Sequence, residues 1–183
     1  MDHRLLFLIG ASGAGKTTVA KKLEKTGTGV QVCYFDSIGV PSLEEMERDY
    51  GSGEEWQRVK TIEWIRNIKQ DYLGEKDTIL DAQTRPSFIQ EGCKEAAVEN
   101  YRIILFDCSD EVRRERLSGR GQPELATERM MEWGKYLREE CQKEGCVVVD
   151  TSTLTIEQGM AALKEMVSNS EIQEVKGEKW NIR

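Results

Sequence analysis

The sequence opens with an apolar run that leads directly into a glycine-rich loop. Residues Leu5–Ile9 are all apolar and predict a buried strand. The residues that follow, Gly10–Thr17, match the phosphate-binding pattern G-x-x-x-x-G-K-[ST], and the chain then takes up a helical pattern. Because strand, loop and helix occur in the order that this motif requires, the match predicts a polyphosphate site within an α/β fold.

Each residue type in this loop has a physical reason to be there. Glycines let the backbone turn tightly so that peptide N–H groups face phosphate oxygens, and the helix dipole adds positive charge at the same point. Lys16 is expected to bridge the β- and γ-phosphates, Thr17 to offer its hydroxyl to Mg²⁺, and Thr18 to reach the α-phosphate. The predicted nucleotide-binding residues of the loop are Gly10, Ala11, Ser12, Gly13, Ala14, Gly15, Lys16, Thr17 and Thr18. The motif therefore predicts that the chain binds a nucleoside triphosphate together with Mg²⁺. ATP is the expected nucleotide, and the choice between ATP and GTP stays open.

Length, charge and cysteine content limit the possibilities further. A chain of 183 residues is long enough for one well-buried domain and short for two. The net charge of −7 gives no general attraction to nucleic acid or to an anionic membrane, so both partners are disfavoured. The five cysteines form no C-x-x-C pair, which is typical of reduced thiols in the cytoplasm. We expect a cytoplasmic protein without a membrane segment, and the oligomeric state stays open.

Short apolar runs alternate with longer segments of helical period. The expected strands are Leu5–Ile9, Val30–Phe35, Thr78–Leu80, Arg102–Phe106 and Cys146–Val149. The expected helices are Gly15–Lys25, Ser42–Tyr50, Gly53–Leu73, Pro86–Glu99, Asp110–Leu117, Glu124–Glu144 and Thr155–Ser168. Ser42 and Glu45 are expected to form a capping box, and Asp110 and Thr155 to cap the helices that follow them. The alternation predicts a three-layer α/β fold with a parallel sheet.

The domain organisation is expected to be simple. Residues 1–169 are predicted to form a single domain. Two segments are predicted to be additions to the sheet core, at residues 39–73 and in the glycine-rich stretch 118–126. Residues 170–183 are charged, without clear helical period, and are predicted to form a C-terminal arm. The sequence leaves open whether Trp180 in this arm docks on the body or on a partner.

Aspartates follow four of the expected strands. In open parallel sheets the ligand lies beyond the carboxyl ends of the strands, so carboxylates at these positions can reach it. Asp36 is expected to orient or deprotonate an acceptor hydroxyl, and Asp81 to support Mg²⁺ or the substrate. Asp107 and Asp150 are expected to be turn and cap residues, because their strands lie farther from the loop.

An arginine-rich segment stands out in this acidic chain. Arg113 is expected on an exposed helix face, paired with acidic neighbours at helical spacing. Arg116 and Arg120 are one turn apart, where the helix gives way to a glycine-rich loop. This is the position of a lid that closes arginines onto a nucleotide, and positive charge delivered there can promote phosphoryl transfer.

Taken together, these motifs resemble those of the small P-loop kinases, a group that includes adenylate, shikimate and gluconate kinases. The resemblance is carried by Gly10–Thr17, Asp36, Asp81–Arg85 and Glu115–Arg120, and it follows the chain in order over most of its length. It implies a P-loop NTPase fold with a parallel sheet of five strands in the order 2-3-1-4-5 and helices on both faces. It also implies an ATP-dependent kinase activity on a small-molecule acceptor.

The resemblance further implies roles for individual residues. Arg116 would stack on the nucleobase, Arg120 would contact phosphates, and Arg85 would hold the acceptor. Asp36 would lie near the accepting hydroxyl, and residues 39–73 would cover the acceptor, with residues 118–126 as a short lid. The expected catalytic residues are Lys16, Asp36 and Arg120, the expected substrate-binding residues are Asp36, Asp81 and Arg85, and the expected Mg²⁺ ligands are Thr17 and Asp81.

Two kinds of function remain open on the sequence alone. The first is a Mg²⁺-dependent phosphotransferase that moves the γ-phosphoryl group of ATP to a hydroxyl of a small metabolite or nucleoside. A nucleoside monophosphate is a less favoured acceptor, because adenylate kinases have an arginine after the second strand and this chain has Asp36–Gly39. The second is a regulatory nucleotide-binding ATPase that signals through residues 39–73. Asp36, Asp81 and the lid arginines favour the kinase, because a pure binder needs no acceptor-side acid.

Overall fold

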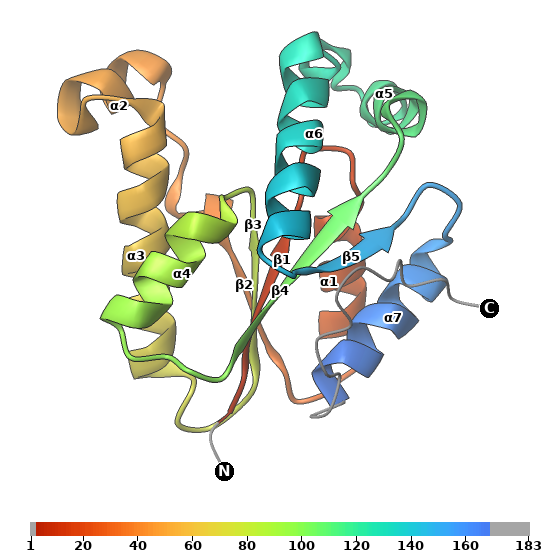
Figure 1. Ribbon diagram of the computed structural model, residues 1–183. Coiled ribbons are helices and arrows are strands. Elements are labelled where there is room, and N and C mark those ends of the chain that lie inside the picture. The colour runs from red at the N-terminus through yellow and green to blue at the C-terminus, as the bar shows by residue number, and fades with distance from the viewer. Residues whose placement is uncertain (1–2, 169–183) are drawn as a thin grey trace.

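The computed structural model of the protein describes residues 3–168, in which a parallel sheet lies between two layers of helices (Figure 1). The five strands are β1 (Leu5–Ile9), β2 (Gln31–Tyr34), β3 (Thr78–Ala82), β4 (Tyr101–Asp107) and β5 (Val147–Asp150). They pair in parallel in the order β2-β3-β1-β4-β5. The three-layer α/β fold and the predicted strand order are therefore confirmed. The arm predicted at residues 170–183, with Trp180, lies outside the described residues.

The helices divide between the two faces of the sheet. They are α1 (Lys16–Glu24), α2 (Leu43–Tyr50), α3 (Gly53–Asp71), α4 (Pro86–Glu95), α5 (Asp110–Gly119), α6 (Glu128–Lys143) and α7 (Ile156–Ser168), with short 3₁₀ helices η1 (Phe35–Ile38) and η2 (Pro123–Leu125). In Figure 1, α3 and α4 lie on one side of the sheet, and α1 and α7 lie on the other. No helix within residues 3–168 has both the length and the apolar character needed to cross a membrane.

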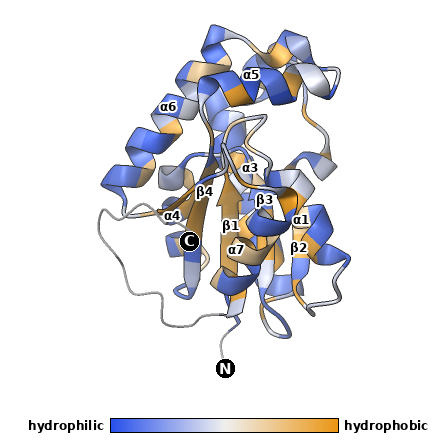
Figure 2. Ribbon diagram, turned by 90° about the vertical axis from the view of Figure 1, so that its right-hand side faces the viewer, coloured by the Kyte–Doolittle hydropathy of each residue, from blue (hydrophilic) through white to orange (hydrophobic). Residues whose placement is uncertain are grey.

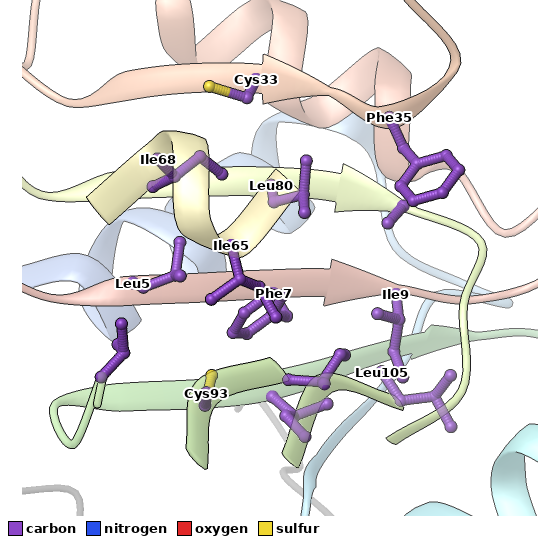
Figure 3. Close-up of a cluster of buried hydrophobic side chains, with 14 of the residues drawn as sticks. Leu5, Phe7, Ile9, Cys33, Phe35, Ile65, Ile68, Leu80, Cys93 and Leu105 are labelled. Carbon is purple, nitrogen blue, oxygen red and sulfur yellow. The ribbon is translucent and has the colours of Figure 1, made fainter. Parts of the chain in front are cut away.

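The strands are apolar at successive positions because both faces of the sheet are covered. In β1, Leu5, Phe7 and Ile9 pack into the core shared with α3, α4 and α6, where Figure 3 shows them among side chains such as Ile65 of α3. The intervening Leu6 and Leu8 belong to the core beneath α1 and α7, and all five residues of β1 are fully buried. Figure 2 shows the resulting contrast between hydrophobic strands and largely hydrophilic outer helices.

The predicted additions to the sheet core contain regular structure. Residues 39–73 form α2 and α3, and α3 packs along α4 on one face of the sheet. Residues 118–126 contain the end of α5 and the short helix η2. In Figure 1, α2 and α5 lie beyond the carboxyl ends of the strands, and α3 runs back along one face of the sheet.

Two of the three predicted helix caps are confirmed, and one is wrong. Ser42 accepts a hydrogen bond from the Glu45 N–H while Glu45 accepts one from the Ser42 N–H, which is the predicted capping box. Thr155 accepts a bond from the Gln158 N–H at the start of α7. The cap of α5 is Ser109 instead of Asp110, because the Ser109 N–H is held by the Ser152 hydroxyl and its own hydroxyl accepts the Val112 N–H. This leaves Asp110 in the first turn of α5.

Gly92 provides a test of how tightly α4 packs on α3. A Cβ atom at Gly92 would lie 2.6 Å from Ile65 Cδ1 and 3.3 Å from Ile62 Cα. Replacing glycine by alanine inside a helix normally stabilises it by about 1 kcal/mol, but overpacking a core costs about 1–3 kcal/mol. We predict that Gly92→Ala lowers Tm by several degrees in a thermal melt. Gly119→Ala, in α5, is the matched control, because a Cβ there meets nothing within 4 Å; a Gly92→Ala melt at or above the parent value would contradict the packing described.

Candidate functional site

The loop that joins β1 to α1 turns tightly against the neighbouring strand. Gly10, Gly13 and Gly15 have φ values of 150°, 87° and 90°, in the region that side chains other than glycine rarely adopt. A Cβ atom at Gly10 would lie 2.2 Å from the carbonyl oxygen of Phe106 in β4. The backbone conformation explains the glycines at all three positions, and at Gly10 the close approach to β4 excludes a larger residue as well.

The carbonyl groups of this loop receive hydrogen bonds from four side chains, which come from α1, from α5 and from the residue after β5. Lys16 Nζ donates to Gly10 O (2.8 Å), Arg113 Nη1 to Ser12 O (3.0 Å), Arg116 Nη1 to Gly13 O (3.4 Å) and Thr151 Oγ1 to Ala14 O (3.0 Å). These bonds fix the orientation of successive peptide groups. The Ala14 N–H donates to the Ala11 carbonyl within the loop. In phosphate-binding loops of this kind, the remaining peptide N–H groups bind the anion.

Lys16, Thr17 and Asp81 form the buried polar centre of the site. Lys16 and Asp81 are only 8% and 6% exposed, and Thr17 Oγ1 donates a hydrogen bond to Asp81 Oδ2 at 2.5 Å. Burial lowers the pKa of the Lys16 ammonium, and the carboxylates of Asp81 and Asp36 oppose that shift. Burial likewise raises the pKa of Asp81, and the charge of Lys16 and the Thr17 hydroxyl act in the opposite direction. Asp81 lies inside β3 and does not follow it, since the strand extends to Ala82.

A cavity of about 540 Å³ at the ends of β2 and β3 brings most of the predicted site residues together. Its lining includes Lys16, Thr17, Asp36, Asp81 and Arg120. We call it the strand-end cavity. Asp36 and Arg120 are exposed at its rim, whereas Lys16 and Asp81 are buried at its base. Residues far apart in the sequence therefore converge on one pocket that holds both acidic and basic groups.

A second cavity, of about 600 Å³, lies on the other side of the same loop, between α5, α7 and the segment after β5. We call it the outer cavity, and its lining includes Arg116, Thr151, Leu154 and Ile156. The walls of the two cavities share Gly13, Gly15, Thr18 and Arg120. The phosphate-binding loop and Arg120 thus lie between the two cavities and border both.

Thr151 is a site residue that the sequence analysis missed. Its hydroxyl lies 3.0 Å from Ala14 O, and it accepts a hydrogen bond from Arg116 Nη1 at 3.0 Å. Arg116 Nη2 donates to the Thr151 carbonyl at 2.6 Å, so the guanidinium is held at the wall of the outer cavity. The signal in the sequence was the position of Thr151 directly after β5, the same strand-end rule that pointed to Asp36.

Arg85 lies outside the lining of the strand-end cavity. Its guanidinium donates to Gln57 Oε1 at 2.7 Å and to Glu54 Oε2 at 3.1 Å, both in α3. Three aromatic rings surround it at 5.0–5.6 Å, those of Phe88, Trp133 and Tyr136. Gln57 also donates to the carbonyl of Gln83, and Gln83 lines the strand-end cavity. Arg85 is therefore connected to that lining through Gln57.

The predictions for Arg113 and Asp107 were wrong. Arg113 is fully buried, and its Nη2 atom donates to Asp107 Oδ1 at 2.8 Å. Asp107 also accepts a bond from Arg138 Nε at 2.5 Å and is not a turn residue. The reason is that α5 turns this face toward the phosphate-binding loop and α6, which helical spacing alone does not reveal. Asp150 does make the local turn that was predicted, accepting a bond from the Ser152 N–H.

The site offers oxygen ligands that fit Mg²⁺. Mg²⁺ is usually held by one or two protein oxygens, with substrate phosphates and water completing its coordination. The Thr17 hydroxyl and the Asp81 carboxylate, in contact at the base of the strand-end cavity, are such a pair. Within residues 3–168, no cluster of three or more His, Cys, Asp or Glu residues offers a metal site of another kind. The five cysteines are all free thiols.

Comparisons with known proteins agree with this geometry. A family model described as an AAA domain matches residues 6–133. The chain belongs to this AAA-domain family. No curated protein sequence matches the chain. The fold of this AAA-domain protein is similar to that of solved kinases, and three of these structures show how far the likeness extends.

The first is a sugar kinase from Janibacter sp. HTCC2649, with 19% sequence identity, a TM-score of 0.67, and coverage of 92% of this chain and 96% of that chain. The second is shikimate kinase from Acinetobacter baumannii in complex with shikimate, with 16% identity, a TM-score of 0.54, and coverage of 93% and 96%. The third is deoxyadenosine kinase from M. mycoides with bound dATP, with 14% identity, a TM-score of 0.58, and coverage of 90% and 100%. The AAA-domain protein therefore has the fold of the P-loop kinases, which confirms the predicted resemblance.

The buried carboxyl of Asp81 makes a prediction about stability. Its raised pKa means that the ionised form is disfavoured in the folded protein, so the protein is less stable above that pKa than it would be with a neutral side chain. We predict that Asp81→Asn raises Tm by a few degrees at neutral pH, because about 1 kcal/mol shifts Tm by about 2–4 °C in a chain of this size.

Thermal melts of parent and Asp81→Asn between pH 4 and pH 8 would check this. The difference in Tm should be largest at neutral pH and shrink as the pH falls through the raised pKa of Asp81, where the parent carboxyl becomes neutral. A lower Tm for Asp81→Asn at neutral pH, or a difference that grows on acidification, would show that the ionised carboxylate stabilises the fold.

Proposed function

We propose that the protein is a Mg²⁺-dependent phosphotransferase that moves the γ-phosphoryl group of ATP to a hydroxyl of a small metabolite or nucleoside. The observation that supports this most strongly is the convergence of Lys16, Thr17, Asp36, Asp81 and Arg120 on the strand-end cavity. A nucleotide-binding protein needs the loop, but it does not need a second pocket lined by an exposed carboxylate beyond the end of the phosphates.

The ATP is proposed to extend across the phosphate-binding loop from one cavity to the other. Its nucleoside occupies the outer cavity, where Arg116 is fixed by two hydrogen bonds to Thr151 and can stack on the base. Its triphosphate lies along the loop, and its γ-phosphoryl group reaches the strand-end cavity. The loop borders both cavities through Gly13, Gly15 and Thr18, which is what this path requires.

Lys16 and Arg120 are proposed to stabilise the charge of the transferring phosphoryl group. Lys16 donates to Gly10 O in this structure and can exchange that bond for the β- and γ-phosphates. Arg120, exposed at the end of α5, borders both cavities and can follow the phosphoryl group during transfer. Thr17 and Asp81 would hold Mg²⁺, which neutralises phosphate charge when bound.

Asp36 is proposed to act on the acceptor. Its carboxylate is exposed at the rim of the strand-end cavity, beside the exposed Ser37. It would accept the proton of the attacking hydroxyl as the hydroxyl oxygen bonds to the γ-phosphorus, while the bond from the γ-phosphorus to the β–γ bridging oxygen breaks and ADP leaves. Arg85 would hold the acceptor from the far side of Gln83, residues 39–73 would cover it, and residues 118–126 would close as a short lid. The free thiols fit a cytoplasmic enzyme.

Transfer of labelled phosphate tests the proposal. The protein is incubated with [γ-³²P]ATP, Mg²⁺ and a panel of sugars, polyols, hydroxy acids, nucleosides and nucleoside monophosphates. Label that moves to a hydroxyl of one panel member supports the proposed function. Label on the phosphate of a monophosphate supports a nucleoside monophosphate kinase instead. Label released only as free phosphate with every acceptor supports the regulatory ATPase and contradicts the proposal.

Lys16→Ala is expected to remove most of the activity. Loss of a single charge-stabilising donor costs on the order of 10²–10³-fold in kcat. The fold should persist, because burial disfavours the charged form of Lys16. The ammonium group therefore does not stabilise the folded protein at neutral pH. Initial rates and far-UV circular dichroism of parent and variant check both statements. Parental turnover by Lys16→Ala would remove this residue from the mechanism.

Asp36→Asn is expected to separate catalysis from nucleotide binding. A positioned general base contributes about 10²–10⁴-fold, so kcat should fall within this range while the Kd for ATP stays close to that of the parent. Glu165→Gln, an exposed carboxylate in α7 outside the lining of both cavities, is the matched control and should keep the parental kcat. If Asp36→Asn turns over as fast as the parent, the assignment of the base is wrong.

A further inference from the structure

The buried Arg113 has no part in the function proposed so far. It is fully buried, and its guanidinium lies between Asp107 at the end of β4 and Ser12 in the phosphate-binding loop. Nη2 donates to Asp107 Oδ1 at 2.8 Å, and Nη1 donates to Ser12 O at 3.0 Å. Within residues 3–168, its Nε atom is buried without a hydrogen-bond partner. Arg113 therefore connects the sheet directly to the loop.

Stability alone does not explain an arginine at this place. Transfer of a guanidinium and a carboxylate out of water is unfavourable, and apolar side chains of similar size in place of a buried ion pair are often neutral or stabilising. The unpartnered Nε adds to that cost. The neighbouring inward position of α5, Leu117, is apolar and also fully buried. A leucine or methionine at 113 would serve a purely structural role as well.

Space for the guanidinium is provided by two glycines. A Cβ atom at Gly134 of α6 would lie 2.9 Å from Arg113 Nη2, and a Cβ atom at Gly13 of the loop would lie 3.0 Å from Arg113 Cγ. Gly134 lies in the middle of a long helix, where glycine is normally unfavourable. The fold thus contains a fitted slot for this side chain against the loop.

We infer that Arg113 is a positioning residue for the phosphate-binding loop, which it holds in its anion-binding conformation by fixing the Ser12 carbonyl. Of the loop carbonyls with side-chain donors, Ser12 depends on Arg113, whereas Gly10, Gly13 and Ala14 are bonded by Lys16, Arg116 and Thr151. A Ser12 carbonyl without a donor could rotate inward, toward the phosphates that it would repel. Asp107 neutralises the arginine and fixes its orientation, and Arg138 of α6 holds the other oxygen of Asp107.

The inference rests on the nucleotide-binding part of the proposed function and makes no use of the acceptor. Its test therefore measures binding and not phosphoryl transfer. The Kd of Mg·ADP and of inorganic tripolyphosphate is measured by titration calorimetry, and Tm by a thermal melt. If the parent protein binds both ligands but transfers no phosphate, the proposed phosphotransferase function is contradicted. The role of Arg113 can still be tested by binding.

The main variant is the double substitution Asp107→Leu with Arg113→Met, which removes both buried charges and retains the buried volume. We expect its Tm to stay within a few degrees of the parent value, while both ligands bind about tenfold more weakly. Arg138→Met is the matched control, because it removes the other partner of Asp107 but leaves Arg113 on Ser12. It should bind both ligands as tightly as the parent.

Arg113→Lys keeps the charge opposite Asp107, but a single ammonium cannot reproduce the fork that joins Asp107 to Ser12. We expect it to melt close to the parent and to bind tripolyphosphate at least threefold more weakly. If the double variant does not fold, Arg113→Lys alone tests the positioning role of Arg113. Parental affinity in whichever of these two variants folds would overturn the inference. Loss of folding in both would also overturn it, because Arg113 would then serve the core.

Discussion

The close approach of the first loop to β4 is the constraint on which the rest of the structure depends. Gly10 has no room for a side chain against the carbonyl of Phe106, and from this glycine the loop leads from the end of β1 at Ile9 to the start of α1 at Lys16. This turn sets Lys16 and Thr17 at the base of one cavity and Arg116 at the wall of the other. The loop is then bonded through its carbonyl groups to α5 and to the residue after β5. Binding of phosphate and packing of the sheet are parts of a single arrangement.

The fold could be read from the sequence because its signals are local. Apolar runs covered on both faces, such as Leu5–Ile9, cannot be mistaken for half-exposed strands, and the motif at Gly10–Thr17 fixes a strand before it and a helix after it. The strand order followed from the resemblance and not from the apolar pattern. The strand-end rule identified Asp36 and Asp81 without any knowledge of their partners, since parallel strands bring their carboxyl ends to one edge.

Other parts of the site could not be predicted because they depend on contacts between distant segments. Arg113 is indistinguishable by helical spacing from the exposed arginines around it, and only the packing of α5 against the loop and Gly134 shows that it is buried. Thr151 carries no motif of its own. The ring of aromatic side chains around Arg85 joins α4 to α6, two helices separated in sequence by a strand and by α5. The identity of the acceptor also depends on contacts between segments that are distant in the sequence.

The most direct test of the account is a crystal structure with a non-hydrolysable ATP analogue and Mg²⁺. The account predicts that Lys16 Nζ leaves the Gly10 carbonyl for the β- and γ-phosphates, that the base lies in the outer cavity beside Arg116, and that the γ-phosphate reaches the strand-end cavity near Asp36. A structure in which the analogue binds elsewhere, or in which Lys16 stays on Gly10 with the triphosphate directed away from Asp36, would contradict it.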